Sequence, residues 1–517
     1  MALTYYLSID GIVGNSLREG YEGAFVIADY SFDVSALVSA LSGSGSSTSK
    51  STFSPLVVDL KIGFGLTDLL KDIAGGRHIS SIELKGVSPD GERVYDLKLG
   101  DVFVTQLHDT DGSDRLAFTY QQVSLTTWSQ DNTGQFNPVT VSWNIETNRE
   151  GASIPDPIVP TGAPHGSGGT NFYLTVDGIV GDSLSDQHRG AFEISDYSFD
   201  VSALVSALSG SGSSTSKSTF SPLIVDLKIG SGLTDLLKDI AGGRHISSIE
   251  LQGDTANGTL AYDLKLGDVF VTQLHDTDGI DRLAFTYQQV SLTTWSQDNT
   301  GQSNPVTVSW NIETNREGAS IPDPVVPTGA PHGSGGTNFY LTVDGIVGDS
   351  LSDQHRGAFE ISDYSFDVSA LVSALSGSGS STSKSTFSPL IVDLKIGSGL
   401  TDLLKDIAGG RHISSIELQG DTANGTLAYD LKLGDVFVTQ LHDTDGIDRL
   451  AFTYQQVSLT TWSQDNTGQS NPVTVSWNIE TNREGASIPD PIVPTGAPHG
   501  SGGTNFYLTV DGIVGDS

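Results

Sequence analysis

Apolar and polar residues alternate along several short segments of the chain, which is the pattern of half-buried β-strands. In residues 171–176, Phe172, Leu174 and Val176 share one face of such a strand. Residues 139–146 show the alternation most clearly, with apolar and polar side chains at every second position. The same reasoning predicts further strands at residues 5–9, 23–36, 56–62, 79–84, 95–107 and 116–128.

One segment has helical spacing instead. Its apolar residues are Leu66, Leu69, Leu70 and Ile73. Thr67 can cap the start of this helix, and Gly75 and Gly76 end it. We therefore predict a mainly β fold, in which a small antiparallel β-barrel carries one short α-helix.

The whole pattern recurs. Asp10, Asp177, Asp344 and Asp511 stand in nearly identical surroundings, each 167 residues after the one before. The chain thus contains three copies of one unit and the opening of a fourth. A unit of this size can bury its own core, so separate beads on a string are the default expectation.

The units are separated by segments rich in proline and then in glycine, which favour an extended and a flexible conformation respectively. We place the units and linkers at the following boundaries: repeat 1 at 1–148, a linker at 149–170, repeat 2 at 171–315, a linker at 316–337, repeat 3 at 338–482, a linker at 483–504, and the first strand of a fourth repeat at 505–517.

Charge and composition reduce the number of function classes that fit the chain. The formal net charge of −36 argues against binding to nucleic acid or to an anionic membrane surface. The chain has no cysteine and no apolar run long enough to span a membrane, and its N-terminus lacks the pattern of a signal peptide. No phosphate-binding loop and no set of nucleophile, base and acid stands out, so we predict no enzyme and no catalytic residue.

A carboxylate-rich turn recurs in every unit. Alternating carboxylates around a glycine can bind calcium, although the distal glutamate of the best-known calcium loop is missing. The same Asp-Gly turn is also what a β-hairpin requires, and the sequence leaves both interpretations open. The candidate metal ligands are Asp109, Asp111, Asp114, Asp276, Asp278, Asp281, Asp443, Asp445 and Asp448.

Several motifs occur in a fixed order in each unit. In the first unit they are Ala74-Gly75-Gly76-Arg77-His78, then Asp114-Arg115-Leu116, then Trp143-Asn144-Ile145. In this order the chain resembles the Hcp family, the hemolysin-coregulated tube proteins of type VI secretion systems. The resemblance covers about residues 4–148, 171–315 and 338–482.

The resemblance implies a β-barrel with a helix on its side, hexameric rings that stack into a hollow tube, effector transport, and export without a signal peptide. It also implies that the loop at residues 42–54 helps rings to stack, which makes Ser44, Ser46 and Thr48 candidate interface residues. Members of the family are usually single domains, so the fusion of three domains is a departure. Two chains could form one ring of six, or successive repeats could stack along a fibre.

Residues 502–517 contain one strand-length segment, and the sequence holds no further strands of a fourth repeat with which it could pair. The piece is either a truncated repeat or a strand donated to another chain, in which case assembly grows by β-augmentation. Its candidate interface residues are Phe506, Tyr507, Leu508 and Val510.

We therefore expect a secreted, structural protein that assembles with itself into an extracellular tube or filament of covalently linked barrels. A type VI secretion tube component that carries effectors is the first alternative, and a calcium-dependent adhesin or matrix module is the second. No cofactor is expected unless the aspartate turns bind calcium.

Overall fold

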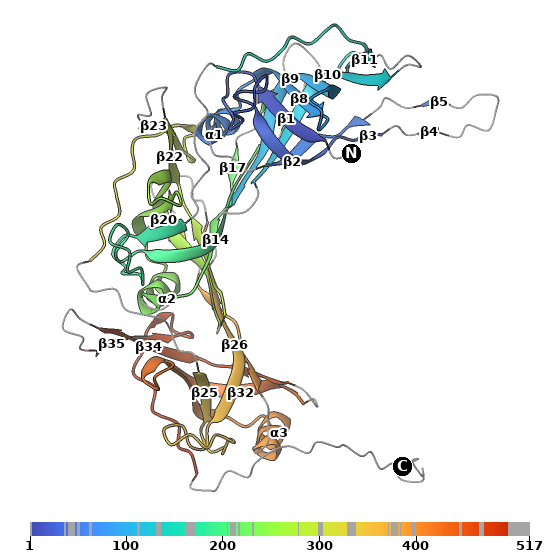
Figure 1. Cartoon of the computed structure of the whole chain (residues 1–517). Helices are drawn as coiled ribbons and strands as arrows, with labels where there is room; N and C mark the ends of the chain where they lie inside the picture. The colour runs from blue at the N-terminus through green and yellow to red at the C-terminus, as the bar shows by residue number, and fades with distance from the viewer. Residues whose placement is uncertain are drawn as a thin grey trace, which may run out of the picture.

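A computed structural model shows three barrels that follow one another along an elongated, gently curved body, with repeat 1 and repeat 3 at opposite ends (Figure 1). The structure describes residues 3–35, 38–39, 47–48, 52–60, 65–110, 114–130, 136–160, 171–203, 205–206, 214–215, 218–229, 232–277, 279–297, 303–327, 338–370, 372–373, 381–382, 384–394, 399–443, 447–464 and 470–494.

Each repeat contains the predicted helix among many strands. Repeat 1 consists of β1 (Thr4–Ile9), β2 (Phe25–Ser31), β3 (Val34–Ser35), β4 (Val38–Ser39), β5 (Ser47–Thr48), β6 (Thr52–Phe53), β7 (Leu56–Leu60), α1 (Leu66–Gly75), β8 (Ile79–Val87), β9 (Arg93–Thr110), β10 (Asp114–Gln130), β11 (Phe136–Asn144) and β12 (Arg149–Glu150).

Repeats 2 and 3 reproduce this order. Repeat 2 consists of β13 (Asn171–Val176), β14 (Phe192–Ser202), β15 (Val205–Ser206), β16 (Ser214–Thr215), β17 (Thr219–Phe220), β18 (Leu223–Leu227), α2 (Leu233–Gly242), β19 (Ile246–Asp254), β20 (Leu260–Thr277), β21 (Asp281–Thr286), β22 (Gln289–Gln297), β23 (Ser303–Asn311) and β24 (Arg316–Glu317). Repeat 3 consists of β25 (Asn338–Val343), β26 (Phe359–Ser369), β27 (Val372–Ser373), β28 (Ser381–Thr382), β29 (Thr386–Phe387), β30 (Leu390–Leu394), α3 (Leu400–Gly409), β31 (Ile413–Asp421), β32 (Leu427–His442), β33 (Asp448–Thr453), β34 (Gln456–Gln464), β35 (Ser470–Asn478) and β36 (Arg483–Glu484).

The predicted antiparallel barrel is confirmed. In repeat 1 the strands pair in the closed cycle β1, β2, β7, β10, β9, β8 and back to β1. The alternation read from the sequence points one side chain in two into the barrel, so that Leu56, Val58 and Leu60 of β7 are buried. Closure leaves no free edge among these six strands.

The helix lies where it was predicted, but its N-terminal cap does not. Gly65 occupies the capping position with a φ of 74°, and Thr67 is buried inside the first turn. A left-handed backbone at this position suits glycine, because a Cβ there would lie 2.6 Å from the side chain of Ile12. The helix ends at Gly75 and is capped by Gly76, also with a positive φ, so the predicted glycine end is confirmed.

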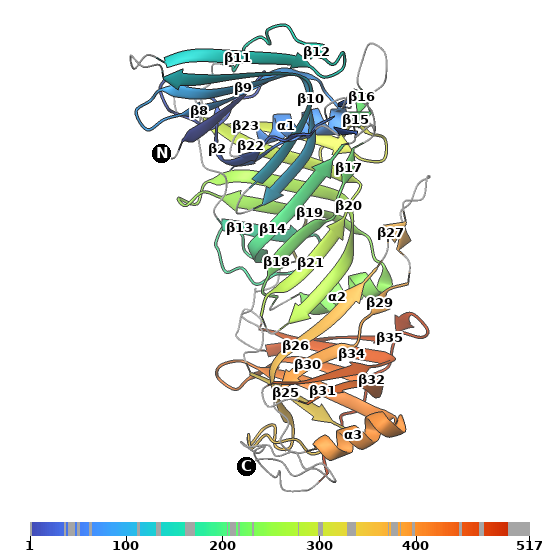
Figure 2. The same cartoon turned by 90° about the vertical axis from the view of Figure 1, so that its right-hand side faces the viewer.

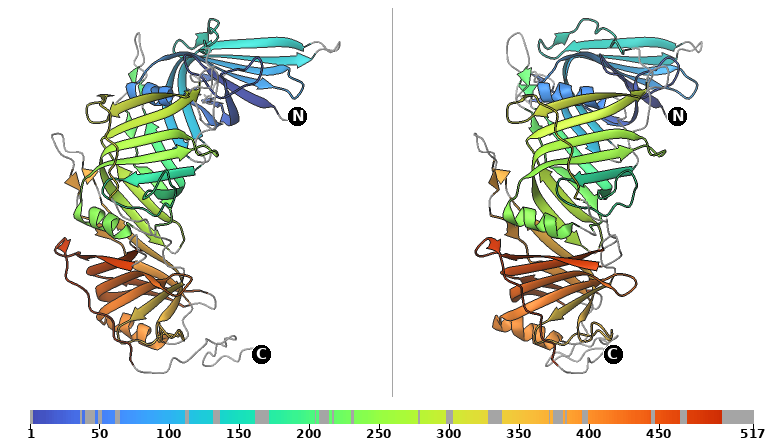
Figure 3. Two further views of the ribbon diagram at one scale, coloured as in Figure 1. Left: turned by 60° about the vertical axis from the view of Figure 1, so that its left-hand side comes forward. Right: turned by 90° about the vertical axis from the view of Figure 1, so that its left-hand side faces the viewer.

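Neighbouring repeats touch directly, a contact that the default expectation of beads on a string did not require. Figures 2 and 3 show α2 lying between the sheets of repeats 2 and 3. The strand predicted at residues 23–36 ends at Ser31 in repeat 1, whereas its counterparts β14 and β26 each continue for four more residues, over a Phe-Asp-Val-Ser sequence that repeat 1 also has. The longer strands are those that pair with the preceding repeat.

The first half of each linker lies on the repeat that it follows. In repeat 1, Ile158 accepts a hydrogen bond from the backbone N–H of Gly11 (3.0 Å), and its own N–H donates to Asp10 (2.8 Å). Ile154 is buried against Gly100. We call residues 154–160, with their equivalents 321–327 and 488–494, the straps.

Candidate functional site at the joints between repeats

The contact between consecutive repeats, which we call the joint, continues one barrel sheet into the next. The end of β9 pairs antiparallel with β14, with Asp109 opposite Phe199 and Leu107 opposite Val201. The end of β20 pairs with β26 in the same register. The joint thus has the geometry of strand addition, in which backbone hydrogen bonds fix the register.

A buried carboxylate lies at the centre of each joint. Asp109 of repeat 1 is 2% exposed, and its two oxygens accept hydrogen bonds from the hydroxyls of Tyr197 (3.2 Å) and Tyr262 (2.8 Å) of repeat 2. The second joint repeats this arrangement, since Asp276 accepts hydrogen bonds from Tyr364 (3.1 Å) and Tyr429 (2.8 Å).

Polar contacts surround this centre. His108 and Asp200 form a hydrogen bond across the first joint, with 2.5 Å between Nδ1 and Oδ1. At the rim, Lys71 of α1 lies 3.1 Å from Glu317 of repeat 2. The hydroxyl of Ser218 donates to the carbonyl of Ile73 (2.6 Å) in the last turn of α1.

The helix of each repeat packs against the last hairpin of the next one. A Cβ built on Gly75 of α1 would lie 3.7 Å from the indole of Trp310, which is buried. Gly242 of α2 stands in the same relation to Trp477, at 3.6 Å. Glycine at the helix end therefore leaves room for the tryptophan of the following repeat.

Two complementary surfaces make up each joint, and we name them by their contents. The helix face is the end of the repeat that carries the α-helix; in repeat 2 it consists of Leu237, Ala241, Phe270, His275 and Asp276. The tyrosine face is the opposite end; in repeat 3 it consists of Tyr364, Phe366, Val368, Tyr429, Val475 and Trp477.

Burial controls the protonation of the joint. It raises the pKa of Asp276 well above its usual value, and the neighbouring carboxylate Asp281 raises it further, while the two tyrosine hydroxyls and Lys228 act in the opposite direction. Burial likewise raises the pKa values of Tyr364 and Tyr429. The carboxylate therefore lies in a place that disfavours its charge.

The structure gives the predicted metal ligands other contacts. Asp114 accepts the N–H of Thr110 (3.0 Å), and Asp281 accepts those of Thr277 (2.8 Å) and Ile229 (2.7 Å). Such bonds belong to the hairpin turn, the other interpretation of this motif. Within the described ranges no group of three His, Cys, Asp or Glu side chains is arranged for a metal. The middle aspartates of the three turns lie outside those ranges, so calcium binding stays a prediction; they are Asp111, Asp278 and Asp445.

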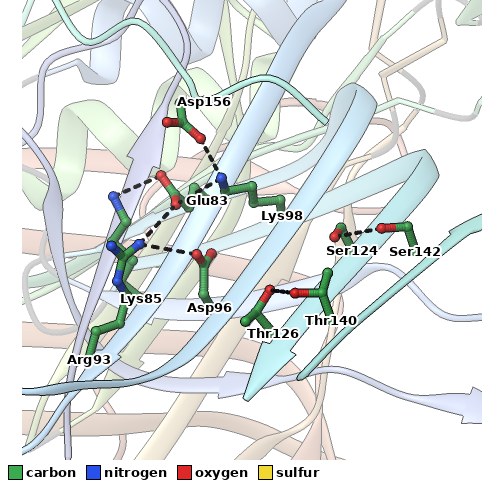
Figure 4. A network of polar contacts seen from close by, with 10 residues as sticks. All are labelled: Glu83, Lys85, Arg93, Asp96, Lys98, Ser124, Thr126, Thr140, Ser142 and Asp156. Carbon is green, nitrogen blue, oxygen red and sulfur yellow. Dashed lines mark hydrogen bonds and ion pairs between the residues drawn. The ribbon is translucent and has the colours of Figure 1, made fainter. Parts of the chain in front are cut away.

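A network of charges fastens each strap to its barrel (Figure 4). Lys98 of β9 pairs with Asp156 of the strap and, at 3.5 Å, with Glu83 of β8. In repeat 1, two more cations join the cluster: Lys85 lies 2.8 Å from Glu83, and Arg93 lies 3.2 Å from Asp96. Repeats 2 and 3 have leucine at the position of Arg93 and glutamine at that of Lys85, so a single lysine serves the whole cluster there.

The predicted assembly residues are placed only in part. Thr48 lies in the short strand β5, whereas Ser44, Ser46 and residues 495–517 lie outside the described part of the chain. Every described repeat supplies its own first strand, for example β1, which pairs with β2 and β8. Strand donation from residues 505–510 therefore stays a prediction, and it would have to displace such a strand.

Sequence reasoning missed the joint itself. The one signal on α1 is its apolar stripe of Leu66, Leu69, Leu70, Ile73 and Ala74, which the structure buries but whose spacing is also that of a helix on a single barrel. The hydroxyls and the carboxylate at the centre of the joint carry no comparable signal, because tyrosine and aspartate are ordinary on strands and turns. Within the described residues, no helix is long and apolar enough to cross a membrane.

Solved structures similar to the chain include a type six secretion system protein (21% identity, TM-score 0.27), Hcp1 from Salmonella typhimurium (22%, 0.24) and a type VI secretion system effector from Yersinia pestis (16%, 0.22). The alignments cover 29%, 28% and 27% of this chain and 99%, 97% and 98% of those chains, so each has the length of one repeat. Among curated proteins, none matches the chain.

Comparison with protein families gives the same unit. A family model described as "Type VI secretion system effector, Hcp" matches residues 6–127, 173–294 and 340–461. These three matches together span most of the chain, one in each repeat. The chain therefore belongs to the Hcp family, the tube proteins of type VI secretion systems, and carries three copies of the Hcp domain in tandem.

Proposed function

We propose that this protein is a secreted structural component whose chains join end to end, through the same joint that links their repeats, into a tube or filament. The observation that carries the proposal is the presence of two nearly identical joints within one chain, together with one further copy of each face that no described residue covers. Repeat 1 presents this tyrosine face, and repeat 3 presents this helix face.

The uncovered faces expose side chains that the joints bury. On the helix face, Leu70 and Leu237 are 0% and 1% exposed, whereas Leu404 of repeat 3 is 54% exposed. Phe437 is 37% exposed, although Phe270 is 6% exposed. Because the helices have the same sequence, the difference comes from the next repeat, which covers α1 and α2 but not α3.

The tyrosine face shows the same contrast. Val34 and Val141 of repeat 1 are 49% and 65% exposed. Their counterparts in repeat 3, Val368 and Val475, are 1% and 8% exposed. Repeat 1 retains the residues that such a joint uses, including Tyr30, Asp33, Tyr95, Trp143 and Glu150.

The two faces differ from each other, so a second copy that docks on one end leaves its own far end free. A head-to-tail contact of this kind builds an open filament, unless the rotation between successive chains brings the last chain back to the first and forms a ring. A secretion tube that carries effectors would use the same stacking and would add a cargo in its lumen. The proposal thus includes both the export of the protein and its assembly into a filament.

The proposal can be tested by replacing Gly409, the last residue of α3, with a larger residue. A Cβ built on Gly409 would have no atom within 4 Å, so Gly409→Leu leaves the fold of the chain intact. In a joint between two chains this leucine would clash with the indole of Trp143. The equivalent glycines, Gly75 and Gly242, lie against the indoles of Trp310 and Trp477.

We expect electron microscopy and sedimentation velocity to show filaments for the native protein and three-barrel particles for Gly409→Leu. Leu351→Ala, which changes an exposed loop residue outside the joints, is the matched control and should assemble normally. Equal assembly of Gly409→Leu and the native protein, or three-barrel particles in every sample, would contradict the proposal.

A further inference from the structure

Repeat 1 differs from the other two repeats directly behind its tyrosine face. Tyr5 of β1 stands where repeats 2 and 3 have Phe172 and Phe339. The centre of the Tyr5 ring lies 4.8 Å from that of Tyr30. Phe172 lies 4.8 Å from Tyr197, the equivalent tyrosine of repeat 2, so the ring occupies the same place in both repeats. The difference between the repeats at this position is therefore one hydroxyl.

Three tyrosine hydroxyls gather on the uncovered face of repeat 1. Tyr30 and Tyr95 correspond to the two tyrosines that bind the carboxylate at each joint, and Tyr5 adds a third. Burial and a hydrogen bond to Tyr30 raise the pKa of Tyr5 to about 12, and burial also raises the pKa of Tyr30 to about 12. The pKa of Tyr95 is raised by burial as well. All three hydroxyls therefore keep their protons near neutral pH and are hydrogen-bond donors.

The carboxyl group at a joint has room for a third donor. The two oxygens of Asp276 accept hydrogen bonds from Tyr364 and Tyr429, and a carboxyl group retains further acceptor positions beyond these two. The hydroxyl of Tyr5 bonds to that of Tyr30, so it lies one hydrogen bond away from the place that a docked carboxyl group would take. Because a tyrosine hydroxyl rotates about its C–O bond, it can turn toward that group.

The group that fits these hydroxyls is carried by the opposite end of the same chain. Asp443 is the equivalent of Asp276 in repeat 3, and it is exposed. Residues 233–281 and 400–448 have the same sequence, so the helix face of repeat 3 has the residues that present Asp276 at the second joint. The partner that this face of repeat 1 fits is therefore a second copy of the chain.

A joint between two chains lacks one advantage of the joints within a chain. Repeats of one chain are covalently linked, which holds their faces together at an effective concentration on the order of millimolar. Two separate chains meet from solution, so their joint needs more binding free energy from its own contacts. The additional hydroxyl occurs in the one repeat whose tyrosine face no described residue covers.

We propose that Tyr5 adapts the tyrosine face of repeat 1 to a separate chain, by giving the carboxyl group of Asp443 from a second copy a third hydroxyl donor. The inference rests on the proposed function, because it requires that two chains dock end to end. In the competing explanation, the hydroxyl only hydrates an uncovered ring, since Tyr5 is partly exposed whereas Phe172 and Phe339 are 4% exposed. The two explanations predict different effects of Tyr5→Phe on association.

Sedimentation velocity of the native protein and of Tyr5→Phe at pH 7 tests the proposal, with EDTA present to keep calcium off the aspartate turns. Phenylalanine is the residue of repeats 2 and 3 at this position, so the barrel accepts it and the urea midpoint should stay the same. We expect the association constant to fall about tenfold, the loss of one hydrogen bond to a carboxyl group. An association constant that is unchanged or higher would overturn the proposal in favour of the hydration role and leave end-to-end docking intact.

A second comparison shows whether the hydroxyl acts on the carboxyl group. The amide of Asp443→Asn has one acceptor oxygen instead of two, so Tyr5→Phe should cost much less association in that background than in the native chain. Equal losses in both backgrounds would show that Tyr5 acts by packing alone, which would also overturn the proposal.

The matched control removes a hydroxyl away from the joints. Tyr340 follows Phe339 on β25, so its side chain lies on the opposite side of the strand, where its ring stacks on His355 at 4.1 Å. Tyr340→Phe should associate as the native protein does, and a tenfold loss there would mean that the effect of Tyr5→Phe is not specific to the face. Absence of association by the native protein would overturn the docking proposal itself.

Discussion

The leucine at the centre of the helix face provides a test with internal controls. Leu237→Ala and Leu404→Ala make the same change in helices of identical sequence, α2 and α3. Leu237 is 1% exposed because repeat 3 covers it, whereas Leu404 is 54% exposed at the free end. The two substitutions should therefore act on different properties of the protein.

The burial sets the size of each effect. Replacing a buried leucine by alanine costs about 2–5 kcal/mol of stability, and Leu237 belongs to this class. Leu404 is already half exposed, so its loss should cost the isolated chain less than about 1 kcal/mol. Docking of a second copy would bury the exposed half, so Leu404→Ala should weaken association by about 1–2 kcal/mol, or roughly 5- to 30-fold.

Urea unfolding followed by circular dichroism and sedimentation velocity together measure both effects. Leu237→Ala should lower the urea midpoint clearly, while Leu404→Ala should leave the midpoint nearly unchanged and weaken association. Midpoints rather than free energies are compared, because a chain of three repeats need not unfold in one step. Equal losses of midpoint for the two variants would show that repeat 3 does not bury Leu237, and the reasoning from matched positions would fail.

Three further predictions concern the straps and the turns. Burial and the nearby Glu250 raise the pKa of Asp263 to about 7, so stability falls as the pH rises from about 4 to 7; Asp263→Asn should therefore stabilise the protein more at pH 8 than at pH 4, by a difference on the order of 1–3 kcal/mol that appears as a larger rise of the melting temperature at pH 8. An equal effect of the substitution on the melting temperature at both pH values would contradict the raised pKa of Asp263. Asp177→Ala removes the acceptor for the N–H of Val325 (2.9 Å) and should speed proteolysis of the second linker without unfolding the barrels; resistance equal to that of the native protein would mean that the other strap contacts suffice. If the aspartate turns bind calcium, millimolar calcium should raise the melting temperature, and the absence of a shift would remove that prediction.

Much of the repeat could be read from the sequence, because a small barrel is specified by local patterns. Alternation of period two locates strands such as β7 and β11, and the paired glycines locate the end of α1. The start of α1 could not be read in the same way, because Gly65 caps the helix by its backbone conformation, whereas Thr67 offered a side chain that the structure buries instead.

By itself, the sequence determined the repeat of 167 residues, the mainly β fold with one helix and the membership of the Hcp family. Only the tertiary structure decided what lies between the repeats. The partners of Asp109 are Tyr197 and Tyr262, which stand 88 and 153 residues further along the chain. Contacts between residues so far apart in the sequence depend on how one folded barrel packs against the next. A local pattern of apolar and polar residues does not predict that packing.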